Sequence, residues 1–127
     1  MPTAEEQANF PQLDEFTLAY VEAALWSSCD ESGTPLDKNY GILECAPATL
    51  ERMQADCLVF ERANAADMEV RNAESAGHDF WLTRNRHGAG YWDGDWPKEV
   101  GERLTKAAHA FREIDLYIGD DGLIYAL

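Results

Sequence analysis

The sequence predicts an α+β domain in which an antiparallel sheet of two β-hairpins packs against three or four α-helices. Apolar residues recur at three- and four-residue steps in the N-terminal half and again over residues 98–111, as on the buried face of a helix. Two later stretches, 78–96 and 114–125, place aromatic and β-branched residues around glycine-containing turns, which is typical of hairpins. The length of 127 residues suits a single domain spanning residues 1–127.

The first predicted helix runs from about Gln12 to Ser28. Asp14 and Glu15 lie in its first turn, where the helix dipole favours negative charge. Residues 1–10 before it are expected to form a flexible tail, in which Phe10 is a candidate anchor. The apolar positions of this helix are Leu13, Phe16, Tyr20, Val21, Ala24 and Leu25.

A loop over residues 29–46 is predicted next, because Asp, Ser, Gly, Pro and Asn are dense there. The following helix begins at Pro47, a residue tolerated in a first helical turn. Its periodic pattern continues to Ala76, with Gly77 as the stop. Either one long helix or two shorter ones fit; because the apolar stripe thins after Phe60, a break or bend near Asn64 is favoured.

The stretch from His78 to Trp96 is predicted to be the central hairpin. In an extended segment Phe80 and Leu82 face one way and Trp81 the other, and the glycine-rich centre supplies the turn. A helix capped by Asp95 or Trp96 should follow, with Pro97 in its first turn. Its apolar stripe is Val100, Leu104, Ala107, Ala108 and Phe111. A closing hairpin over 114–125 turns at Asp120-Asp121-Gly122 and is expected to pair with the central one.

Negative charge is the outstanding property of the composition. The chain has 24 acidic and 10 basic residues, a net charge of −14, and residues 1–51 hold ten carboxylates against one base. Such a field repels nucleic acid and anionic membranes and attracts basic surfaces. Two interpretations stay open, because surplus carboxylates also keep small proteins dispersed without any partner.

Cysteine usage and the chain ends indicate a reduced, cytoplasmic setting. Cys29, Cys45 and Cys57 are odd in number and form no C-x-x-C pair. The N-terminus lacks the basic and apolar regions of a signal peptide, and no apolar run approaches the ~18 residues of a membrane span. Neither the Cys nor the His residues have metal-ligand spacing, and no cofactor motif is present, so neither a metal nor a cofactor is expected.

The block HDFWLTRNRHGAGYWD over His78–Asp93 and the ending DLYIGDDGLIY over Asp115–Tyr125 resemble a family of small uncharacterised proteins encoded in bacteriophage and prophage genomes. The helical segments 13–28 and 47–61 resemble the same family, so the likeness covers most of the chain. The chain departs from the family pattern at Arg86, where glycine is expected, and at Tyr91, where phenylalanine is expected. The resemblance implies a phage origin and an intracellular site of action, and it implies no particular activity.

Three functional hypotheses follow. The first is a non-enzymatic inhibitor that offers carboxylates where phosphates would sit, as anti-CRISPR and anti-restriction DNA mimics do, and so occludes a basic groove of a host protein or nucleoprotein complex. Such a protein would bind neither nucleic acid nor membranes directly. Its predicted partner-binding residues are Glu22, Asp30, Glu31, Asp37 and Glu44.

The second hypothesis is a small enzyme or anion-binding module at the central turn, in which Arg84 and His87 bind an anionic group and Asp93 or Asp79 orients the histidine. The third is an accessory phage protein that acts, as an oligomer, through an aromatic surface. It rests on the four tryptophans Trp26, Trp81, Trp92 and Trp96, because a sheet with rings on both faces leaves one face uncovered.

Overall fold

The computed structural model describes residues 12–127, so the predicted tail and the anchor at Phe10 lie outside the described residues. The described chain contains four α-helices and one two-stranded antiparallel sheet, which confirms the α+β class. Only one of the two predicted hairpins forms. The elements are α2 (Glu15–Ser27), the 3-10 helices η1 (Leu36–Lys38) and η2 (Ile42–Glu44), α3 (Pro47–Met68), α4 (Ala73–Arg84), α5 (Lys98–His109), β1 (Leu116–Ile118) and β2 (Ile124–Ala126).

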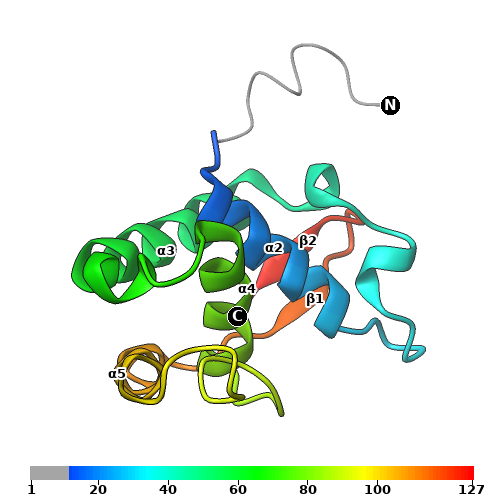
Figure 1. Cartoon of the computed structure of the whole chain (residues 1–127). Helices are drawn as coiled ribbons and strands as arrows, with labels where there is room; N and C mark the ends of the chain where they lie inside the picture. The colour runs from blue at the N-terminus through cyan, green and yellow to red at the C-terminus, as the bar shows by residue number, and fades with distance from the viewer. Residues whose placement is uncertain (1–11) are drawn as a thin grey trace.

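Helix α2 lies at the centre of the molecule, beside α4 (Figure 1). It begins where the Asp14 carboxylate accepts a hydrogen bond of 2.9 Å from the Thr17 backbone N–H, a side-chain N-cap. Most of its residues are buried, so it has a narrow exposed strip in place of a broad polar face. Leu18, Glu22 and Trp26, at four-residue steps, make up much of that strip.

The predicted central hairpin is wrong. His78–Arg84 belongs to α4, and residues 85–97 form a loop of turns and bends. Asn72 starts α4 by accepting a hydrogen bond of 2.7 Å from the Ser75 N–H. Consecutive residues from Asp79 to Arg84 are all buried, because other elements cover α4 on several sides. The aromatic side chains Phe80 and Trp81 suggested the two faces of a strand. They belong instead to a helix that is buried in the core.

Gly77 does not stop a helix, as the sequence suggested, but lies inside α4 where α4 crosses α2. A Cβ atom at this position would lie 1.9 Å from the backbone carbonyl oxygen of Phe16. The two backbones therefore approach too closely for any other residue. This contact sets the distance between the two helices that carry the groove described below.

Helix α3 confirms the predicted break, because Asn64 has non-helical backbone angles (φ −126°, ψ 19°). Its side-chain Nδ2 donates to the Phe60 carbonyl oxygen at 2.9 Å, which caps the first segment from within. The helix ends at Met68 and does not continue to Ala76 as predicted. A turn over residues 69–72 then leads into α4.

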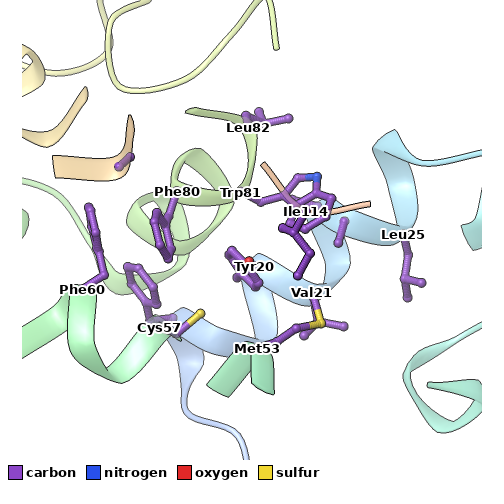
Figure 2. Packing of buried hydrophobic residues seen from close by; sticks show 14 of the residues in the cluster. Tyr20, Val21, Leu25, Met53, Cys57, Phe60, Phe80, Trp81, Leu82 and Ile114 are labelled. Atoms are coloured by element: carbon purple, nitrogen blue, oxygen red, sulfur yellow. The ribbon is translucent and has the colours of Figure 1, made fainter. Parts of the chain in front are cut away.

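An aromatic cluster joins the helices. Phe60 of α3 stacks on Phe80 of α4 with ring centroids 4.1 Å apart, and Tyr20 of α2 meets Trp81 edge-on at 5.3 Å. Figure 2 shows these four side chains converging from three helices. Trp81 also donates from Nε1 to the Ser27 hydroxyl at 2.7 Å, so its one polar atom is satisfied in the core.

The C-terminal elements close the core. Helix α5 buries Leu104 and Ala108, with the rest of its predicted stripe partly buried, but its N-cap is Pro97 and no side chain caps it. The predicted closing hairpin forms as β1 and β2. It pairs not with a second hairpin but with the start of α3, where Ala46 N–H and the Thr49 hydroxyl both donate to the Ile124 carbonyl at 3.0 Å. No helix of residues 12–127 is long and apolar enough to cross a membrane.

Candidate functional site

Two adjoining clefts of about 400 and 500 Å³ lie along the exposed strip of α2. Glu22 and His78 line both clefts, so the two meet at these side chains. We call the pair the α2 groove. Its acidic half is lined by Glu22, Arg71, Glu74, His78, Asp79, Asp93 and Asp95, together with smaller side chains. Its aromatic half is lined by Leu18, Glu22, Trp26, Asp37, Tyr40, Ile42 and His78 among others.

The acidic half gathers carboxylates from three separate parts of the chain. Glu22 comes from α2, Glu74 and Asp79 from α4, and Asp93 and Asp95 from the loop before α5. Among residues 12–127, two basic side chains pair with these carboxylates. The Arg71 guanidinium lies 3.9 Å from the Asp95 carboxylate, and His78 lies beside Asp79. Five carboxylates against one arginine and one histidine leave a negative potential suited to a cation.

Asp79 forms the floor of this half and is 7% exposed. Its Oδ2 accepts a hydrogen bond of 2.7 Å from the indole Nε1–H of Trp96, and its Oδ1 lies 3.4 Å from Nδ1 of His78. A buried carboxylate is retained when hydrogen bonds replace its hydration. Asp79 therefore fixes the Trp96 indole and orients the His78 ring at the junction of the two halves.

The aromatic half provides apolar contact area next to those charges. Trp26 is 58% exposed and Leu18 is 38% exposed. The centroids of the Trp26 and His78 rings are 6.0 Å apart, so Trp26 lies beside the junction with the acidic half. Exposed large apolar side chains beside a charged rim are characteristic of binding surfaces.

The five partner-binding residues predicted from the sequence divide into three environments. Glu22 and Asp37 line the aromatic half of the groove. Asp30 and Glu31 line a neighbouring cleft with Tyr117. Asp30 also closes a tight turn, and hydrogen bonds from the Ser32 hydroxyl and from neighbouring backbone N–H groups lower the pKa of its carboxyl.

Glu44 has a local task as well, since its Oε2 accepts the Gly41 N–H at 2.8 Å and stabilises η2. The structure therefore brings two of the five into the groove and places the other three in the loop beside it.

The structure does not bring the predicted anion-binding residues together. Arg84 is 4% exposed, and its guanidinium donates to the Asp56 carboxylate (2.8 Å), the Tyr20 hydroxyl (3.1 Å) and the Arg112 carbonyl oxygen (2.6 and 3.0 Å). His87 lines a separate cleft beside Trp81, and Asp93 lines the α2 groove. Four of its five N–H donors are already used in the core, so Arg84 has a structural role and is not placed to bind a ligand.

The sequence does not indicate that Glu74, Asp79 and Asp95 line one groove with Glu22. Its pattern assigns Glu74 to the end of the preceding helix, Asp79 to a strand beside the central turn and Asp95 to a helix cap. The available sign was Asn72 followed by Glu74 and Ser75, an N-cap pattern at the start of a helix. In a helix Glu74 and His78 are four residues apart and share a face, as the structure shows by placing both in the groove. Trp26 lies four residues after Glu22 in α2, so the two side chains share the exposed face of that helix.

Comparison with known proteins adds no assignment: no protein-family model, no curated protein and no solved structure matches this chain.

The three cysteines are free thiols, and burial raises the pKa of Cys45 to about 12. Within residues 12–127 no group of three or more His, Cys, Asp or Glu side chains is arranged to hold a metal ion.

Proposed function

We propose that this chain is an acidic binding protein whose α2 groove holds a basic, partly apolar segment of a partner protein. By occupying that segment it blocks the surface on which the partner would bind nucleic acid. The observation that carries the proposal is the meeting of five carboxylates, from α2, α4 and the loop before α5, beside the exposed Trp26. In the setting implied by the phage resemblance, the partner is a host nucleic-acid-handling or defence complex in the cytoplasm.

The two halves of the groove make different contributions to binding. Carboxylates at the rim attract and orient a cationic partner over several ångströms, and salt weakens this contribution. Trp26 and Leu18 bury apolar area, and salt affects this contribution little. An arginine side chain suits the junction, because its guanidinium can pair with Glu22 while its stem lies on Trp26.

Surplus negative charge alone does not account for the composition of the α2 groove. Charge that only disperses the protein needs no particular arrangement and no apolar neighbours. Here five carboxylates from distant parts of the sequence line a cleft that adjoins the cleft of Trp26, a tryptophan that is 58% exposed. That combination resembles the rim and core of a protein–protein interface.

The test compares two variants of equal net charge. The groove variant carries Glu22→Gln, Glu74→Gln and Asp93→Asn. The control variant carries Glu51→Gln, Glu69→Gln and Asp120→Asn, three exposed carboxylates on α3, on the turn after it and in the closing hairpin. Binding of an amphipathic arginine–leucine peptide of about 15 residues is followed by fluorescence anisotropy.

We expect the groove variant to bind the peptide about tenfold more weakly than the wild type, and the control variant to change affinity less than about threefold. Trp26→Ala should weaken binding at high salt as well as at low salt. Equal losses in the groove and control variants would show that only net charge matters. The blocking step is tested by capturing partners from a bacterial lysate at low salt and asking whether the wild type, but not the groove variant, displaces DNA from them.

A further inference from the structure

Another cleft, of about 800 Å³, lies between α5 and the loop of residues 91–97. One wall is a single face of α5, with lining residues at three- and four-residue steps from Lys98 to His109. The other wall includes Tyr91, Trp92 and Trp96. The two walls meet closely at Gly101, where a Cβ atom would lie 2.5 Å from the Tyr91 carbonyl oxygen.

The charge of this cleft is opposite to that of the α2 groove. Lys98, Lys106 and His109 line it, and Glu102 is the carboxylate among its lining residues. Within residues 12–127 neither lysine nor His109 forms an ion pair. In a chain of net charge −14, lysines that stay free of the many available carboxylates leave cationic groups for a ligand.

A further observation indicates a ligand. Trp92 lines the cleft and is 54% exposed, so much of a large ring is uncovered beside the lysines. Lys106 and His109 lie within one helical turn on the same face of α5, so their polar groups can reach one small anionic head group.

We propose that this cleft binds a small planar aromatic acid, with its ring against Trp92 and its carboxylate at Lys106 and His109. The lining is more apolar than polar, which disfavours an inorganic anion or a polyphosphate. A neutral aromatic compound would leave Lys106 without a charged partner. Single-stranded nucleic acid combines rings with negative charge, but the net charge of −14 repels a long polyanion.

The probe pair is 2-naphthoate and its neutral isostere 2-naphthamide, titrated into ¹⁵N-labelled protein and followed by amide and indole NMR shifts. We expect naphthoate to shift Trp92 and the amides of Thr105–His109, and naphthamide to bind at least about tenfold more weakly. Equal affinity for the two compounds, or shifts centred on the α2 groove, would overturn the proposal. A short oligonucleotide competing with naphthoate would overturn the assignment to a small acid.

Variants assign the contacts. Lys106→Gln and Trp92→Ala should each weaken naphthoate binding by about tenfold. The matched controls, Lys38→Gln and Trp26→Ala, alter another exposed lysine and another exposed tryptophan and should leave binding unchanged.

Discussion

Glu61 on α3 should make the stability of this protein fall as the pH rises. Its Oε2 atom is buried, and no N–H or O–H group of another described residue donates a hydrogen bond to it. Burial, together with the neighbouring Asp14, raises the pKa of the Glu61 carboxyl from 4.5 to about 8. Burial alone would raise the pKa of Asp14 too, but hydrogen bonds to Thr17 and Glu61 hold it below its usual value. A proton on Glu61 supplies the donor that two ionised carboxylates lack.

The sign follows from proton linkage. Between about pH 4.5 and pH 8 the folded state keeps a proton on Glu61 that the unfolded state has released. Raising the pH therefore favours unfolding across this interval, and the loss is complete above about pH 8. The whole shift corresponds to roughly 5 kcal/mol, but Glu61 is partly exposed and solvent screens the pair, so we expect about 1–2 kcal/mol.

The variant Glu61→Gln tests this, because an amide can donate to Asp14 at every pH. Urea unfolding, followed by tryptophan fluorescence at several values between about pH 6 and pH 9, gives the free energy of unfolding. The difference between Glu61→Gln and the wild type should grow with pH in favour of the variant. Glu51→Gln, on the exposed side of the same helix, is the control. A difference that stays constant across this range would refute the reasoning.

Two further predictions concern the packing that supports the α2 groove. Gly77→Ala should destabilise the protein by about 3 kcal/mol or more, since α2 and α4 must separate, whereas Gly88→Ala, with no atom near its new Cβ, should change stability by less than about 0.5 kcal/mol; thermal unfolding compares them. Arg84→Met should cost about 3–5 kcal/mol in denaturant unfolding, because it leaves the Asp56 carboxylate without its partner. The exposed Arg62→Met is its control, and similar losses in the two variants would contradict the structural role of Arg84.

The sequence predicted elements well where one face of the element meets solvent. On α5 the apolar residues recur among exposed polar ones, so their periodicity predicts the helix. In the closing hairpin the Asp-Asp-Gly sequence predicts the turn. The bend at Asn64 follows from the same reasoning, since the apolar stripe on α3 ends there.

Periodicity did not predict α4, and the reason is physical. Residues 79–84 are buried on all sides, so the contrast between apolar and polar positions disappears and neither a helical nor a strand period can be read. Gly77 was misread for a related reason, because a glycine that permits close helix contact has the same letter as one that ends a helix.

From the sequence alone came the α+β class, the single-domain size and the excess of 14 negative charges, because these depend on composition and local pattern. Tertiary structure alone decided which carboxylates share a cleft. Glu22, Glu74 and Asp93 are far apart in the chain. The close crossing of α2 and α4 brings the first two together, and the loop before α5 adds Asp93. It also made Arg84 a core residue and left Lys106 facing an aromatic cleft, because burial and contact are properties of the folded chain that residue spacing does not encode.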